Sequence, residues 1–134
     1  MTFTEAELEY LDSQVLGRLA TVDADGRPQN NPVGFFYNPQ AGTIDVGGRA
    51  LGGTRKFRNV AANPAVSLVV DDLASADPWR VRGIEIRGKA DALTDTEPPR
   101  PGFSREIIRI HPETIFSWGL DPDDPWRMDR RTVG

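Results

Sequence analysis

One stretch of the 134-residue chain combines residue types that could bind an anion. Glycines come first and a threonine and basic residues follow: Gly47, Gly48, Gly52, Gly53, Thr54, Arg55, Lys56 and Arg58. From Phe57 the apolar positions recur at helical spacing, which predicts a short helix with its basic side chains outward. The start of a helix presents unpaired backbone N–H groups and a positive dipole end. We therefore expect an anion such as a phosphate to bind here.

An ordinary solvated helix face would account for the same basic residues. The stretch lacks the Gly-Lys-Ser/Thr ending of a Walker A loop and contains no Gly-x-Gly-x-x-Gly dinucleotide fingerprint. Its glycines would still let the backbone approach a flat or charged ligand closely. The residues of the stretch alone leave both interpretations open.

A second polar group lies earlier, on a strand expected over residues 27–37. Gln29, Asn30 and Asn31 offer amide donors and acceptors beside the small apolar surface of Pro32 and Val33. Proline cannot donate a ladder hydrogen bond, so the strand is expected at an edge, at a bulge or facing a ligand. Exposed polar residues of an edge strand would give the same pattern.

Composition narrows the classes of function. The net charge of −4 and the pI near 5.0 disfavour general affinity for nucleic acid or acidic membranes. With no cysteine and one histidine, His111, we expect no thiol catalysis, no disulfide and no metal centre. No segment approaches the ~20 apolar residues of a membrane span, which predicts a cytoplasmic protein.

The elements around these stretches are mostly strands. Thr4 and Glu7 form a capping-box pattern that predicts a helix over 4–13, expected as a lid on the barrel end. Alternation and turn residues predict strands over 15–22, 27–37, 43–46, 65–70, 79–93, 104–110 and 114–118, with polar loops at 71–78 and 94–102. Six or seven short strands with one buried helix after the third predict a mainly β fold, a small closed or nearly closed barrel. Residues 1–120 form one domain, and 121–134 a tail that is either mobile or laid on a partner subunit.

Three groups of motifs then match one family in order and spacing. They are LGRLATV at 16–22 with GRPQ at 26–29, TRKFRNV at 54–60 with NPAVSL at 63–68, and RIHPETIFSWG at 109–119. On these motifs the chain resembles, over residues 4–119, the split β-barrel flavin/deazaflavin oxidoreductases, the superfamily of pyridoxamine 5′-phosphate oxidase. QNNPVGF at 29–35 and DPWRVRG at 77–83 are similar to its actinobacterial branch, which uses the deazaflavin coenzyme F420 and includes the tetracycline-pathway reductase.

The resemblance implies a homodimer with two cofactor sites at its interface, each lined by both chains. The residues that it implies for cofactor binding are Asn31, Pro32, Val33, Gly47, Gly48, Thr54, Arg55, Lys56, Asn59, Trp79 and Trp118. In that set Thr54, Arg55 and Lys56 hold the phosphate, and Asn59 contacts the phosphate or the polar tail. The tryptophans form a wall supplied by the neighbouring chain, although core packing would explain each of them equally well.

The activity implied is hydride transfer from reduced coenzyme F420 to an enone or quinone-like double bond of a small organic substrate. Two alternatives keep the fold: an FMN-binding flavoprotein, and a non-catalytic protein that binds deazaflavin or flavin. The oligoglutamate tail of the deazaflavin would favour a basic groove, for which Arg49, Arg55, Arg58 and Arg82 are candidates. The chain ends without the C-terminal substrate-binding segment of pyridoxamine phosphate oxidase, so oxidation of that substrate is not expected. The sequence identifies neither the substrate nor a proton donor, and His111 is expected to be structural or exposed.

Overall fold

Antiparallel strands make up about half of the chain in the computed structural model, which describes residues 2–134. The elements are α1 (Glu5–Asp12), β1 (Leu16–Val22), β2 (Pro28–Asn38), β3 (Thr43–Val46), the 3-10 turn η1 (Leu51–Gly53), α2 (Arg55–Ala62), β4 (Ala65–Ala76), β5 (Trp79–Leu93), β6 (Ile107–Trp118) and β7 (Met128–Thr132). The expected mainly β fold, with one helix at the N-terminus and one after the third strand, is confirmed.

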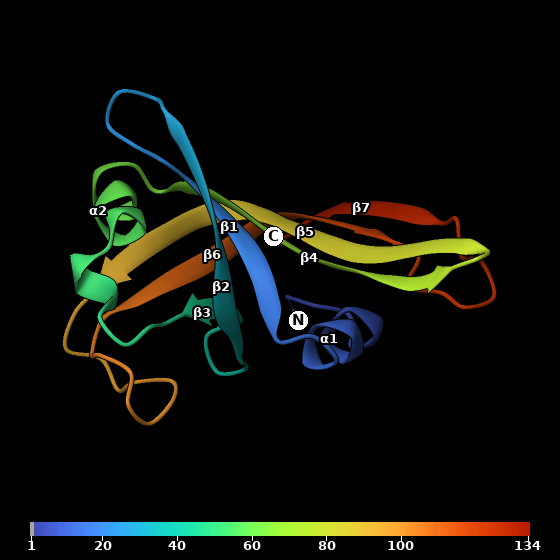
Figure 1. Cartoon of the computed structure of the whole chain (residues 1–134), viewed down its shortest axis with the longest axis horizontal. Coiled ribbons are helices and arrows are strands. Elements are labelled where there is room, and N and C mark those ends of the chain that lie inside the picture. Colours follow the sequence, from blue (N-terminus) through green and yellow to red (C-terminus); the bar gives the residue numbers. More distant parts are fainter. Residues whose placement is uncertain (1) are drawn as a thin grey trace.

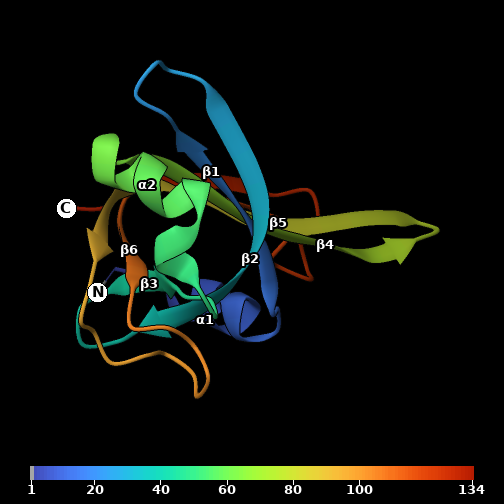
Figure 2. The same cartoon turned by 60° about the vertical axis from the view of Figure 1, so that its left-hand side comes forward.

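The seven strands form one sheet that closes on itself. Their order is β3-β2-β1-β4-β5-β6-β7, and β3 also pairs with β6 through Ile44 opposite Ile110 and Val46 opposite Ile108. Further along the same edge of β6, residues Thr114 to Trp118 pair with β7 instead. The edge of β6 is therefore shared between two strands, and six strands complete a ring (Figures 1 and 2).

Apolar side chains fill the ring because alternate strand residues face inward. Ten aliphatic residues from five strands are buried inside it: Leu19, Ile44, Val46, Leu68, Val70, Ile84, Ile86, Ile108, Ile110 and Ile115. α1 begins at a capping box between Thr4 and Glu7 and adds Tyr10 and Leu11 to the same core. α2 adds Val60 and lies against β1 and β5 on another side (Figure 2).

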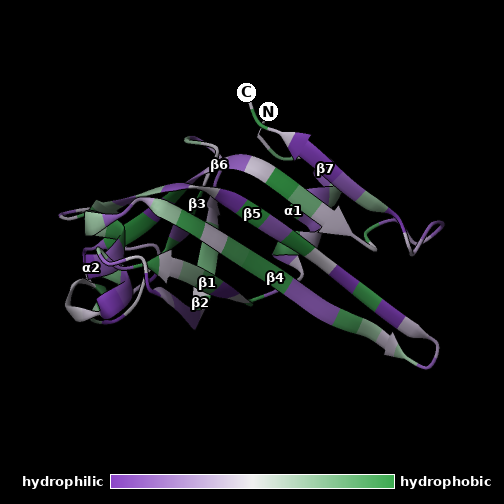
Figure 3. Cartoon of the chain, turned by 90° about the horizontal axis from the view of Figure 1, so that it is seen from above, coloured by the Kyte–Doolittle hydropathy of each residue, from purple (hydrophilic) through white to green (hydrophobic). Residues whose placement is uncertain are grey.

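The hairpin of β4 and β5 extends well beyond the ring, and we call residues 71–82 the arm. In Figure 1 the arm points away from the end of the molecule that carries α2. The sequence predicted a polar loop over 71–78, and this was wrong, because β4 continues to Ala76 and stays paired with β5, with a register shift between Leu73 and Ser75. Its polar residues are held by a cross-strand ion pair between Asp72 and Arg82, 2.7 Å apart. Figure 3 shows hydrophilic and hydrophobic residues alternating along β5, while β4 has a mostly hydrophobic first half.

Two further differences lie in the C-terminal third. Strands expected over 104–110 and 114–118 are one strand, β6, because a bulge carries the chain past His111 and Glu113 without ending the pairing. Gly88 permits this close approach, since a Cβ there would lie 2.0 Å from the carbonyl oxygen of His111. The segment expected as a tail over 121–134 includes β7, which is paired with β6 along five residues.

Candidate functional site

The N-terminus of α2 is open to a ligand. Thr54 is the N-cap: its hydroxyl donates to the carbonyl of Leu51 at 2.6 Å and accepts from the backbone N–H of Phe57 at 3.4 Å. The first backbone N–H groups, those of Arg55 and Lys56, precede the helical ladder and have no partner within it. The first turn of α2 contains no acidic residue. The positive end of the helix dipole is therefore not neutralised by the helix itself.

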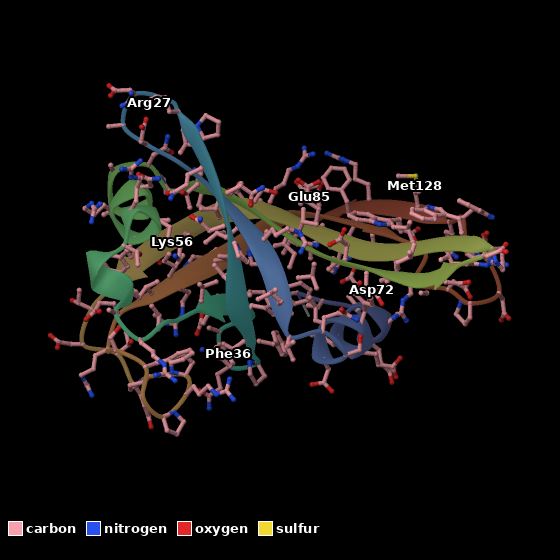
Figure 4. The ribbon with its side chains drawn as sticks, in the orientation of Figure 1. Arg27, Phe36, Lys56, Asp72, Glu85 and Met128 are labelled. Carbon is pink, nitrogen blue, oxygen red and sulfur yellow. The ribbon has the colours of Figure 1, made fainter. Side chains whose placement is uncertain are left out.

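Basic side chains around this helix start lack acidic partners. Within residues 2–134, no ion pair involves Arg49, Arg55, Lys56 or Arg58. Arg58 donates instead to the carbonyl oxygen of Gly53 at 2.9 Å. The arginines of the strands are mostly paired with carboxylates, whereas these four cations gather around the start of α2, where Figure 4 shows Lys56. This donor set suits a phosphate, which takes up both backbone N–H groups and cations.

The glycines before α2 have two different roles. At Gly47 a Cβ would lie 2.8 Å from Pro99, and at Gly52 it would lie 2.8 Å from Glu106. Glu106 also accepts a hydrogen bond from the backbone N–H of Gly52 at 3.0 Å. These two glycines therefore let the chain pack on itself. Beside Gly53 nothing lies within 4 Å of an added Cβ, and at Gly48 a Cβ would meet only Leu51, at an ordinary contact distance of 3.8 Å.

Asn59 is turned inward from α2 and is only 6% exposed. Its side-chain amide donates to the hydroxyl of Thr21 on β1 and to the carbonyl oxygen of Gln29 on β2, each at 3.1 Å. The sequence suggested that Asn59 contacts a ligand. In the structure its amide group joins three elements and thereby fixes the position of α2 against the first hairpin.

Replacing Asn59 with leucine is expected to lower the free energy of unfolding by about 1–3 kcal/mol, because Thr21 and Gln29 lose their donor in a buried place. Urea unfolding followed by circular dichroism measures the change. Asn63→Ala, at the half-exposed end of the same helix, is the control and should cost about 0.5 kcal/mol or less. Equal losses in the two variants would show that the buried amide has no special role.

The three candidates on β2 lie on two faces of the strand. Asn31 is opposite Leu19 and shares a face with Gln29, so it lies on the side of the strand that α2 approaches. Pro32 points to the other face and is exposed, while Val33 is 5% exposed and belongs to the core. The structure thus brings Asn31 toward the α2 residues, leaves Pro32 on the outer face, and gives Val33 a packing role.

Trp79 and Trp118 lie far from these residues within one chain. Trp79 follows the turn at the tip of the arm and is 57% exposed. Trp118 ends β6 and lies across Gly83, where a Cβ would be 2.3 Å from its ring. In Figure 1 the arm and α2 occupy opposite ends of the molecule. One chain therefore does not bring the tryptophans and the basic residues of α2 into one site.

Arg82 was expected in a basic groove, but its charge is compensated. Its guanidinium binds both oxygens of Asp72, and Tyr10 donates a hydrogen bond to the same carboxylate at 2.8 Å. The hydrogen bond from Arg82 holds the pKa of Asp72 below its ordinary value, and burial raises the pKa of Tyr10. These groups fasten α1 to the base of the arm.

Sequence reasoning missed an apolar cavity of about 400 Å³ beside Trp118. Trp126 and Met128 line it and are 71% and 78% exposed. Both come from the segment that was expected to be a tail, rich in aspartate, arginine and proline. The sequence could have indicated this cavity only through these two large apolar residues, which stand among charged neighbours.

Nearly the whole chain is similar to proteins that are already known. The family model described as pyridoxamine 5′-phosphate oxidase matches residues 3–131. A Streptomyces rimosus protein, 5a,11a-dehydrotetracycline/5a,11a-dehydrooxytetracycline reductase, is 49% identical over 124 residues, which cover 92% of this chain and 87% of that protein. No helix among residues 2–134 is long and apolar enough to cross a membrane.

Solved structures agree in fold. A conserved hypothetical protein of Mycobacterium tuberculosis, Rv2991, superposes with a TM-score of 0.70 at 20% identity, covering 98% of this chain and 92% of that one. A heme binding protein from Mycobacterium smegmatis superposes with a TM-score of 0.69 at 18% identity. The superposition covers 97% of this chain and 59% of that protein. At such identities the likeness shows the fold alone.

Proposed function

The chain belongs to the pyridoxamine 5′-phosphate oxidase family, and on that premise we propose that it is a reductase using coenzyme F420. Its substrate would be a small organic molecule with an activated double bond, such as an enone. The observation that carries this proposal is the 49% identity, over 92% of the chain, to a reductase whose name gives a dehydrotetracycline as its substrate. Identity at that level over nearly the whole chain favours the same class of reaction.

The residues at α2 fit the phosphate of the deazaflavin. Lys56 and Arg55 supply positive charge without an ion-pair partner within residues 2–134, and their backbone N–H groups precede the helical ladder. Gly53 leaves open space next to this helix start. Thr54 acts on the ligand indirectly, since its hydroxyl caps the helix that carries the donors. Arg49 and Arg58 are left to meet the acidic tail.

When bound, the reduced deazaflavin supplies a hydride, and the protein provides position and shelter from water. In the reduction of an enone, the hydride adds to the β-carbon and a proton adds to the α-carbon. Asn31, on the α2 side of β2, would orient the ring system through its amide. The proton comes from water or from a polar group of the site.

We further propose that the chain acts as a homodimer. α2 and the two candidate tryptophans lie at opposite ends of one chain, so a complete site would combine α2 of one protomer with the tryptophans of its partner (Figure 1). Large exposed apolar side chains on the arm and its surroundings, such as Leu73 and Trp79, fit burial against a second copy. Two such sites per dimer follow from the twofold symmetry of the usual homodimer.

A hydride-transfer assay tests the reductase. The purified chain, reduced coenzyme F420 and a 5a,11a-dehydrotetracycline are mixed without oxygen, and the absorbance of the oxidised deazaflavin is followed. We expect absorbance to return at a rate that depends on both enzyme and substrate, and no turnover with reduced FMN. Turnover with FMN alone would identify the chain as a flavoprotein. Tight binding of the deazaflavin without turnover would identify it as a non-catalytic binding protein.

A further inference from the structure

We propose that the apolar cavity beside Trp118 binds the fused-ring body of the substrate. The cavity, which we call the tryptophan slot, is lined by Val81, Trp118, Gly119, Pro125, Trp126 and Met128. The inference rests on the proposed function, because the fused-ring class of substrate comes from it. It adds a binding site for the rings of the substrate that lie away from the reacting double bond.

Size and chemistry of the slot suit a flat apolar molecule. Its volume of about 400 Å³ falls within the range of roughly 300–1,000 Å³ typical of small-molecule pockets. None of its six lining residues carries a charge. Indole rings stack on flat unsaturated rings, and the flexible thioether of methionine adapts to irregular outlines. A polycyclic body is the ligand that these walls match.

Backbone geometry holds the walls of the slot in place. Trp118 lies against Gly83, and any side chain at Gly83 would collide with its indole ring. Gly119 turns the chain with a φ of +67°, and a Cβ there would lie 2.2 Å from the carbonyl oxygen of Val81. The N–H of Gly119 donates to the carbonyl of Arg127 at 3.0 Å, and Met128 pairs opposite Trp118. The backbone of the slot and its Trp118 wall are therefore in place before a ligand arrives, while the exposed side chains of Trp126 and Met128 can adjust to it.

A second copy of the chain is the other occupant to consider for this surface. A stable interface takes roughly 20–30 residues from each side, whereas the slot comprises six residues around a hollow. A hollow lined by indole suits a small guest better than the flat face of a sheet. The slot also adjoins Trp118, which the proposed dimer places beside the partner's cofactor, so a guest there would lie next to the hydride donor.

Calorimetric titration with tetracycline tests the slot without requiring catalysis. The full chain is titrated with and without oxidised coenzyme F420, and Trp126→Ala and Val15→Ala are titrated alongside. Val15 is 85% exposed, lies just before β1 and does not line the slot, which makes it the control. We expect Trp126→Ala to weaken binding about tenfold or more, as for an aromatic anchor, and Val15→Ala to leave it unchanged.

Enzyme kinetics and the molecular mass from light scattering distinguish the remaining outcomes of the test. With a dehydrotetracycline, Trp126→Ala should raise KM while the affinity for coenzyme F420 stays the same, and Trp126→Phe should restore most of the lost binding. Equal affinities of the wild type and Trp126→Ala for tetracycline, or no saturable binding, would overturn the slot. Dissociation of a dimer by Trp126→Ala, seen by light scattering, would also overturn it and assign the surface to a second copy. Binding of tetracycline that Trp126→Ala weakens, without any hydride transfer, would support the slot and contradict the proposed reductase activity.

Discussion

Replacing Arg131 with alanine is expected to lower the free energy of unfolding by about 3 kcal/mol, because it leaves the carboxylate of Glu7 buried without its counter-charge. The side chain of Glu7 is 7% exposed, and its partner Arg131 comes from β7. The guanidinium donates through Nε to Glu7 Oε2 at 3.2 Å and through Nη2 to Glu7 Oε1 and to the carbonyl of Thr2 at 2.6 Å. Glu7 also accepts a hydrogen bond from the N–H of Thr4 in the capping box. Removing Arg131 should therefore also weaken the N-terminal cap of α1.

Two variants show whether buried charge is the cause. Arg127→Ala removes an arginine whose ion pair with Asp129 is more than half exposed, and it should cost less than about 1 kcal/mol. Glu7→Gln keeps a side chain suited to the capping box but removes the charge. Combined with Arg131→Ala, it should recover part of the lost stability in urea unfolding. A double variant no more stable than Arg131→Ala would contradict the explanation.

Replacing Lys56 with alanine is expected to weaken binding of coenzyme F420 by about 1.5–3 kcal/mol, the usual value of a hydrogen bond to a charged group. That loss corresponds to a dissociation constant roughly ten to more than a hundred times larger. The reason is that Lys56 has no acidic partner within residues 2–134 and stands at the open start of α2. Calorimetric titration of the full chain measures the change directly.

The chain's other lysine provides a matched control. Lys89 is exposed on β5, and Lys89→Ala removes the same charge from the protein while leaving the α2 terminus intact. Its affinity for the coenzyme should equal that of the wild type, and both variants should unfold at the same temperature. Unchanged affinity in Lys56→Ala would identify the basic residues of α2 as an ordinary solvated face.

Local patterns predicted most of the fold, because the signals they use lie close together in the sequence. Alternation gave β5 its bounds from Trp79 to Leu93, and the capping box gave the start of α1. What the sequence could not show depends on partners far along the chain. β4 continues past residue 70 because Asp72 meets Arg82 and Tyr10, and β7 meets α1 through a pair that is 124 residues apart.

Part of the candidate site could also be predicted from the sequence. The run from Thr54 to Lys56 suggested an anion site by its residue types, and the family resemblance favoured that interpretation over a solvated face. The inward turn of Asn59 was not predictable, because its partners Thr21 and Gln29 come from another hairpin. The tryptophan slot was missed for the same reason, since Trp126 reaches Trp118 only through the pairing of β7.

β7 also affects how the molecule meets its neighbours. It lies last in the sheet order, so one of its sides offers unpaired backbone groups to any passing strand. The strand is five residues long and reads Met-Asp-Arg-Arg-Thr, and the charge of Arg130, which has no ion pair within residues 2–134, repels an identical strand beside it. The strand that completes the slot thus also guards the sheet against edge-to-edge aggregation.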